Sequence, residues 1–317
     1  MITARRQQKP DGSMVDRNRD AGENPPDGVI VYYYLKQKPE DEVKITFRTM
    51  QGEEIKSFTS EGRQRQKLDD NTAVDPTDEE EDKEKKDPKV PKEAGTNRFI
   101  WNMRYPDPKT IDGYVASEAV MSGPIAVPGF YQVDLAVGNQ SLTEKFEIRK
   151  DPRVSASQED LQAQFDLHLK VRDKLSETHD AINMLRNIRQ QVEEWVSRSS
   201  ERQDHEVIAS AAMSLKEKLA PIEDELTQSK AKTRQDTMNW PVKLNGKLAW
   251  LAAVISSSQS APTKQAYELY DELAQRIDVQ LHRLNEIIDT DMVAFNHMMS
   301  ESGIPAIIPI ATIPVKR

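Results

Sequence analysis

Apolar and polar residues alternate with a period of two in a series of short segments in the first half of the chain. In 43–48, Val43, Ile45 and Phe47 would lie on one face of a strand and Lys44, Thr46 and Arg48 on the other. Segments with strand character lie at 29–35, 43–48, 54–58, 99–103, 130–137 and 142–148. Such a series of short strands over about 120 residues predicts an Ig-like or fibronectin-like antiparallel β-sandwich, which we place at residues 27–152.

Two parts of this series have distinctive apolar patterns. VIVYYYL, at 29–35, carries β-branched or aromatic residues on both faces, which predicts a strand covered on both sides. Segments 130–137 and 142–148 flank a turn at Gly138-Asn139 and predict a hairpin. The buried face of its return strand would be supplied by Leu142, Phe146 and Ile148.

The stretch AGTNRFIWNMRYPDP, at 94–108, concentrates apolar residues directly after a long charged run. With a period of two, Phe99, Trp101 and Met103 share one face of a strand. Ile100 breaks the alternation, so we expect the second face to be partly covered as well.

After Asp151-Pro152 the period changes from 2 to 3.6, the period of a helix. Ser157 can cap a helix with Asp160 three residues on, and a helix is expected from about 157 to 198. Further helices are expected at 203–229, with a kink or break at Pro221, at 245–258, and from Pro262 to Met298 with Asp291 interrupting its apolar seam. These segments predict an antiparallel helical bundle of about four helices at residues 153–302, so the predicted fold class is α+β with two domains.

Three further segments are distinguished by their composition. Residues 1–26 are polar and rich in turn formers, and we interpret them as a flexible leader. Residues 59–93 contain few apolar residues and many charges of both signs, which predicts a disordered insertion. Residues 303–317 are apolar but interrupted by proline, which predicts an extended tail along the bundle.

Composition excludes several functional classes. The 317 residues carry a net charge of −9, and this argues against nucleic acid as the main partner. The absence of cysteine excludes disulfides, thiolate metal sites and cysteine nucleophiles. No apolar run approaches the roughly 18 residues of a membrane span, and the N-terminus lacks the apolar core of a signal peptide.

The motifs of common catalytic and nucleotide-binding sites are also absent. The sequence has no G-x-x-x-x-G-K-[ST], G-x-G-x-x-G, G-x-S-x-G or H-E-x-x-H motif. His282 with Glu286 and His297 with Glu301 have i,i+4 spacing, which is more typical of a contact on a helix surface than of a metal site. We therefore assign no catalytic residue, cofactor or metal ligand.

Aromatic residues are the remaining candidates for ligand binding. The ligand-facing candidates are Trp101, Tyr105, Tyr114 and Tyr131. The run Tyr32-Tyr33-Tyr34 together with Trp101 could also form a carbohydrate platform. Alternating burial of these rings in the two faces of a sandwich is the favoured interpretation.

Three stretches in a fixed order resemble a known kind of protein. They are NPPDGVIVYYYL with VKITFRTMQGEEIKSF, then AGTNRFIWNMRYP with GPIAVPGFYQVDLAVGNQSLTEKFEIRKDPR, then PVKLNGKLAWLAAVISSSQSAPTKQAYELYDELAQRIDVQLHRLNEII. Together they resemble, over about residues 24–308, the C-terminal region of bacterial sortilin-like or BNR-type β-propeller proteins, often labelled glycosyl hydrolase-like or sialidase-like. The segment from Pro128 to Val133 is also similar to an entry into a strand in the Ig-like domain of flagellar hook-capping proteins.

The resemblance implies an accessory role, because the propeller itself and its S/T-x-D-x-G-x-x-W boxes are missing. It suggests a non-catalytic interaction module, encoded as a fragment or a separate piece, that docks on a propeller or another envelope protein. The alternatives are a carbohydrate-binding module and a part of a hydrolase whose active site lies in the missing propeller. Family members of this kind imply a periplasmic or secreted location, and the helical seam would also allow a dimer.

Overall fold

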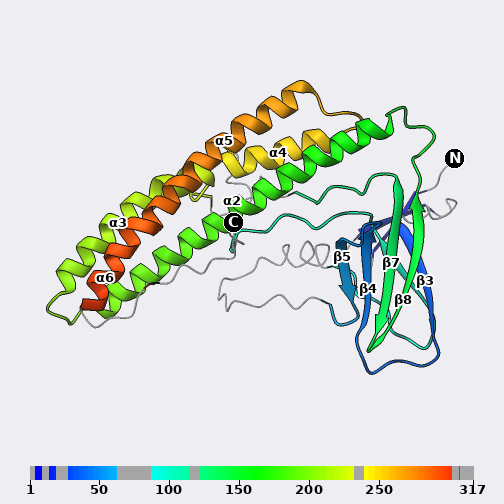
Figure 1. Cartoon of the computed structure of the whole chain (residues 1–317), viewed down its shortest axis with the longest axis horizontal. Coiled ribbons are helices and arrows are strands. Elements are labelled where there is room, and N and C mark those ends of the chain that lie inside the picture. The colour runs from blue at the N-terminus through cyan, green and yellow to red at the C-terminus, as the bar shows by residue number, and fades with distance from the viewer. Residues whose placement is uncertain are drawn as a thin grey trace. The chain divides into compact units, whose positions relative to one another are not determined.

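The computed structural model describes residues 4–8, 14–18, 28–62, 87–113, 121–231, 239–301 and 307. The predicted fold class is confirmed: the chain is α+β, with the antiparallel sheets of a β-sandwich followed by a helical bundle (Figure 1). The strands are β1 (Ala4–Gln8), β2 (Met14–Asn18), β3 (Val29–Leu35), β4 (Val43–Thr49), β5 (Glu54–Thr59), β6 (Gly95–Trp101), β7 (Gly129–Val137) and β8 (Gln140–Ile148). The helices are α2 (Gln158–Arg198), α3 (His205–Leu226), α4 (Leu244–Ser256), α5 (Lys264–Ile287), a π-helical turn (Ile288–Met292) and α6 (Val293–Glu301).

The described strands form three separate sheets. β1 and β2 pair in antiparallel register within residues 1–26, the range that the sequence predicts to be a flexible leader. Their sequences show no alternation of apolar and polar residues from which these strands could have been predicted. β3 pairs with β6 in antiparallel register, with Val29 opposite Trp101. The third sheet has four strands in the order β5–β4–β7–β8.

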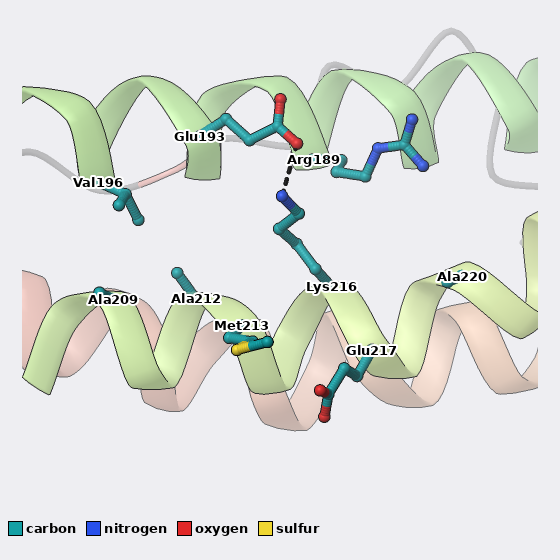
Figure 2. Close-up of a pocket in the computed structure, with 9 residues that line it drawn as sticks. All are labelled: Arg189, Glu193, Val196, Ala209, Ala212, Met213, Lys216, Glu217 and Ala220. Carbon is teal, nitrogen blue, oxygen red and sulfur yellow. Dashed lines mark ion pairs between the residues drawn. The ribbon is translucent and has the colours of Figure 1, made fainter.

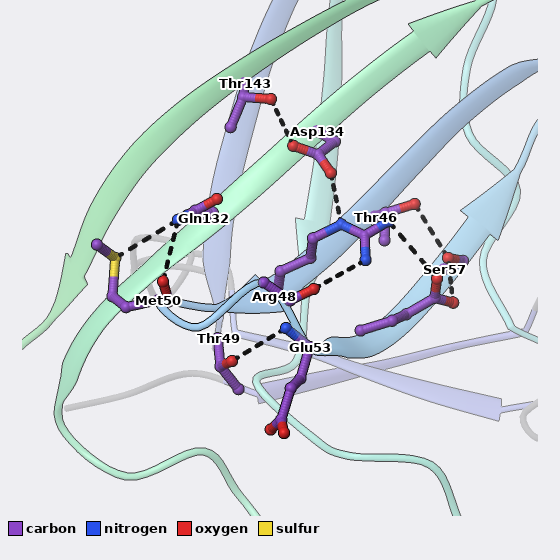
Figure 3. Close-up of polar contacts among 11 residues, drawn as sticks. Thr46, Arg48, Thr49, Met50, Glu53, Ser57, Gln132, Asp134 and Thr143 are labelled. Carbon is purple, nitrogen blue, oxygen red and sulfur yellow. Dashed lines mark hydrogen bonds and ion pairs between the residues drawn. The ribbon is translucent and has the colours of Figure 1, made fainter.

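A polar network crosses the four-stranded sheet (Figure 3). Arg48 Nε of β4 donates to Asp134 Oδ2 of β7 at 2.6 Å, and Thr143 Oγ1 of β8 donates to Asp134 Oδ1 at 2.7 Å. Desolvation by burial would raise the pKa of Asp134, but the hydrogen bonds from Thr143 and Arg48 and the charge of Arg48 together lower it. The network therefore joins three neighbouring strands through one ionised carboxylate.

The two faces of β3 have different environments. Tyr33 is buried, whereas Tyr32 is 64% exposed and Tyr34 is 68% exposed. The prediction that both faces of 29–35 are covered is therefore wrong. β3 has a hydrogen-bonded neighbour only in β6 among the described strands, and a period of two then separates a covered face from an open one.

The end of the charged insertion is packed rather than disordered. Val90 is buried, and the Tyr33 hydroxyl donates a hydrogen bond to the Pro91 carbonyl. These contacts correct the predicted boundary of the insertion at 93, because residues 87–93 are ordered by the same unit as β3 and β6. The start of the predicted insertion at 59 is also corrected, because Thr59 is the last residue of β5 and its side chain accepts a hydrogen bond from the Gly62 amide. Residues 63–86, on which the rest of that prediction falls, lie outside the described residues.

The hairpin of β7 and β8 confirms its predicted strands but not all of its predicted core. Phe146 stacks on Tyr131 with ring centroids 5.8 Å apart and meets Phe47 edge-on at 6.1 Å. Leu142, however, is 71% exposed. β8 is the last strand of its sheet, so its outer residues have fewer neighbours to cover them.

The helices form a bundle in which α2 runs in one direction, α3 and α4 follow each other in the opposite direction, and α5 runs in the direction of α2 (Figure 1). α3 packs on the C-terminal half of α2, where Lys216 pairs with Glu193, and α4 packs near the N-terminal end of α2, where Gln164 donates to the Ile255 carbonyl (Figure 1). α5 returns parallel to α2, and its Asp278 lies 2.7 Å from Lys174. The core comprises apolar residues of all these helices.

The predicted helix signals have mixed outcomes. Ser157 and Asp160 form the expected capping box at the start of α2. Of the kink or break predicted at Pro221, the break is absent, because α3 runs through this residue as one helix. At Asp291, the interruption of the seam corresponds to the π-helical turn, and Lys218 pairs with the Asp291 carboxylate at 2.5 Å.

An extended segment at 106–112 lies along α2 and is bound mainly through its backbone. Ile111 is buried in the core of the bundle. Side chains of α2 at helical spacing contact the segment: Arg172 donates to the Pro106 carbonyl, Ser176 accepts from the Lys109 amide, His179 contacts the Lys109 carbonyl, and Asn183 contacts both Thr110 and Asp112. We call residues 106–112 the strap.

The chain divides into two compact units, and the division does not fall at the predicted boundary of 152–153. One unit is Met1–Lys44, Phe58–Met103 and Val137–Asn139, and the other is Ile45–Ser57, Arg104–Ala136 and Gln140–Arg317. The strap gives a physical reason for the difference, because it joins residues before 152 to α2.

The predicted tail at 303–317 lies outside the described residues except for Ile307. Ile307 is buried, and its backbone is held from both sides by Asn296 of α6. Asn296 Nδ2 donates to the Ile307 carbonyl at 2.8 Å, and the Ile307 amide donates to Asn296 Oδ1 at 2.7 Å.

Candidate functional site

The candidate aromatic residues do not gather at one surface. Trp101 is fully buried at the end of β6. Tyr131 is buried beside Phe146, and its hydroxyl donates to the Val127 carbonyl at 2.7 Å. Burial raises the pKa of Tyr131 to about 12, with a smaller contribution from Tyr105. Both rings are part of the interior and not of a ligand platform.

Tyr105 is likewise engaged in packing. Its ring meets Phe165 of α2 edge-on with centroids 4.8 Å apart, and burial raises the pKa of its hydroxyl. Tyr114, the fourth candidate, lies outside the described residues. Of the three described candidates, Trp101 and Tyr131 are buried and Tyr105 is partly buried.

Within the run Tyr32-Tyr33-Tyr34 of β3, the rings of Tyr32 and Tyr34 are exposed. The strand register places Tyr32 opposite Arg98 and Tyr34 opposite Thr96. The carbohydrate platform that the sequence raised as an alternative thus has two of its tyrosines on an open face, with Trp101 buried. Alternating burial and exposure could be predicted here, but which tyrosine faces outward depends on the pairing with β6.

Among the described residues, no cluster of side chains meets the requirements of a metal site. No group of three or more histidine, aspartate or glutamate side chains is placed to hold a metal ion within the described ranges. His168 and His179 of α2 are both buried, and burial is the main cause that lowers their pKa values, to about 4 for His168. They are packed as neutral side chains in the bundle.

An apolar groove lies between α4 and the start of α5. Its volume is about 490 Å³, and its lining includes Trp250 and Val254 of α4 and Leu269 of α5. These side chains are exposed by 62%, 62% and 43%, respectively. Lys247 and Gln265 also line the groove, so the apolar floor lies beside polar groups.

The sequence of α4 explains why apolar side chains remain in solvent. LNGKLAWLAAVIS is apolar on nearly all sides, and a helix of this kind is usually buried all round. Its inward face supplies Leu244, Leu248, Leu251 and Ile255 to the core. Trp250 and Val254, four residues apart, then share the opposite face. Sequence reasoning found this apolar helix but not the surface it forms with α5.

A second groove lies between α2 and α3 and has a different character (Figure 2). Its volume is about 670 Å³, and the ion pair between Lys216 and Glu193, at 2.7 Å, bridges the two helices. Much of its lining is small, including Ala209, Ala212 and Ala220. It lacks an exposed aromatic anchor, so the groove of α4 and α5 is the stronger candidate for binding.

Comparisons with known proteins give no relative from which a function could be transferred. No family model matches the chain, and neither a curated protein nor a solved structure is significantly similar to it. Within the described residues, no helix combines the length and apolar character needed to cross a membrane.

Proposed function

We propose that this chain is a non-catalytic interaction module that docks on a partner protein through the groove of α4 and α5. The observation that carries the proposal is Trp250, which remains 62% exposed beside this groove. Tryptophan is enriched among the residues that dominate binding energy at protein interfaces.

The chemistry of the groove favours an amphipathic helix as the docking element. Trp250 and Val254 lie on one side and Leu269 on the other, which suits an apolar stripe laid between them. The two helices of the groove also carry exposed charges of both signs. These are Lys247 on α4 and Glu268 and Glu272 on α5. A partner helix with an apolar face and charged flanks would match both features.

The resemblance in sequence adds a candidate for the partner. A β-propeller protein of the sortilin-like or BNR type is the first to be tested, in the periplasm or outside the cell. On this proposal any hydrolytic activity belongs to the partner and not to this chain.

The test compares full-length chains that differ at one position. Trp250→Asp should weaken binding of the partner while the thermal unfolding midpoint stays unchanged, because this side chain is mainly in solvent. Each candidate partner, beginning with a β-propeller protein, is purified and titrated with the wild-type chain and with the variant. We expect the dissociation constant to rise by at least about 30-fold in Trp250→Asp, the loss typical of an interface hot spot.

The matched control is Val279→Asp, at an exposed apolar position of α5 that does not line the groove. It should bind like the wild type. A partner whose titrated affinity is unchanged by Trp250→Asp would contradict the proposed surface. Hydrolysis of glycosides or peptides by the purified chain alone would contradict the non-catalytic role.

A further inference from the structure

We propose that the open face of the β3–β6 sheet binds an acidic oligosaccharide, whose rings stack on Tyr32 and Tyr34 and whose carboxylate pairs with Arg98. This inference goes beyond the docking function and concerns a different part of the chain. It rests on the arrangement, rigidity, charge and size of this face.

The register brings the three side chains together. Tyr32 and Tyr34 are two residues apart on β3, which separates their Cα atoms by about 6.6 Å along the strand. Arg98 lies directly opposite Tyr32 and diagonally from Tyr34, within reach of long side chains. The arrangement thus has two aromatic rings with a guanidinium group beside them.

The face is held rigid from behind. Tyr33 donates a hydrogen bond from its hydroxyl to the Pro91 carbonyl, and Asn97 contacts both the amide and the carbonyl of Glu93. Phe99 packs on Phe58 with ring centroids 4.9 Å apart. A ligand would therefore meet side chains on an ordered sheet, which lowers the entropy cost of binding.

The charge of the face is opposite to that of the chain. Its residues are Ile30, Tyr32, Tyr34, Thr96, Arg98 and Ile100. Arg98 is the charged member, and within the part of the chain that the structure describes it makes no ion pair. Lys36 follows at the end of β3 and is also exposed. A positive face on a chain with net charge −9 selects an anion over a neutral or cationic ligand.

The size of the face favours a short oligosaccharide over a protein. Two paired strands of seven residues span about 23 Å by 10 Å, or roughly 230 Å². A stable protein interface buries about 800 Å² on each partner, several times this area. Tyrosine offers an apolar ring and a hydroxyl at once, as stacking of a sugar with hydrogen bonding to its rim requires.

The test is calorimetric titration of the full chain with trigalacturonic acid and with its methyl ester, which has the same rings without the charge. We expect the acid to bind at least about tenfold more tightly than the ester, with a preference that falls as salt is added. Tyr32→Ala and Tyr34→Ala should each weaken binding of both ligands about tenfold. Arg98→Gln should remove the preference for the acid and leave binding of the ester in place.

Phe130→Ala is the matched control, because Phe130 is an exposed aromatic residue on β7, in the other compact unit. It should bind both ligands like the wild type, and all four variants should melt at the wild-type temperature. The proposal is overturned if the acid and a hyaluronan tetrasaccharide both bind more weakly than about 1 mM. Equal affinity for acid and ester, unchanged binding in the tyrosine variants, or tighter binding of a short single-stranded oligonucleotide would each overturn it too.

Discussion

Trp101 shows how a conspicuous aromatic residue can serve the fold alone. It ends β6 opposite Val29, and its side chain is fully buried. Its backbone is also tightly placed: a Cβ atom added to Gly28, which has φ of +146°, would lie 2.3 Å from the Trp101 carbonyl oxygen. Neighbouring backbone and side chain therefore restrict this position together.

We predict that Trp101→Ala destabilises the protein by about 3–5 kcal/mol, because it removes a large buried side chain and leaves a cavity. Chemical denaturation with urea would measure the change. Tyr34→Ala, on the exposed face, should change the free energy of unfolding by less than about 0.5 kcal/mol. A small loss of stability in Trp101→Ala would show that this side chain is not a core anchor.

At the scale of elements, the strap is a non-helical segment that packs on α2 and adds Ile111 to the core of the bundle. Asn183 makes two of its contacts: Nδ2 donates to the Thr110 carbonyl and Oδ1 accepts from the Asp112 amide, each at 3.0 Å. Lys109 adds an ion pair with the largely buried Asp180 at 2.6 Å. The strap thereby fixes where the chain after β6 meets the bundle.

We predict that Asn183→Ala loosens the strap without unfolding the bundle. Loss of these hydrogen bonds should cost about 1–2 kcal/mol and speed hydrogen–deuterium exchange at the Asp112 amide. Asn187→Ala, one turn further along α2, is the control, since the side chain of Asn187 bonds to Gln191 and not to the strap. Equal exchange at Asp112 in both variants would contradict the assigned role of Asn183.

At the scale of the whole molecule, two buried histidines should make the protein sensitive to acid. Burial, followed by the charge of Arg104, lowers the pKa of His168 to about 4, while a hydrogen bond to the Ser122 backbone opposes this and Arg172 adds a smaller effect. For His179, burial also lowers the pKa, against the opposing effects of Lys109 and Asp180. Histidine in the unfolded chain has a pKa near 6.5. Between this pH and the lower folded-state pKa values, the unfolded chain therefore binds more protons than the folded chain.

The sign of the resulting pH dependence follows directly. Above about pH 6.5 both histidines are neutral in the folded and unfolded states, so they cause no loss of stability. As the pH drops towards 4, the free energy of unfolding should fall by up to about 1.4 kcal/mol per pH unit because of His168. Urea midpoints at pH 7.5, 6 and 5 would measure the slope. His168→Gln should flatten it, and an unchanged slope in this variant would show that His168 does not cause the acid sensitivity.

The features of this fold that could be predicted from the sequence are those that depend on residue type and local spacing. The buried alternation of Val43, Ile45 and Phe47 and the cap at Ser157 were evident because each depends on residue type and local spacing. The strap was not predicted, since α2 binds it largely through backbone groups that every residue possesses. The surfaces were missed for another reason: the exposure of Tyr32 and Trp250 depends on which elements pair, and this is a long-range property.

The strap also sets a limit on how the chain can change length. The contacts on α2 run from residue 172 to 183 and those on the strap from 106 to 112, in the same direction. From Arg172 to Asn183 the helix rises about 16 Å, which an extended chain covers in about five residues. The contacts join backbone groups of the strap to side chains spaced along α2, so many substitutions in the strap would leave these contacts in place. One added or deleted residue would instead displace every later contact together, so related chains should keep the length of this segment while its residues drift.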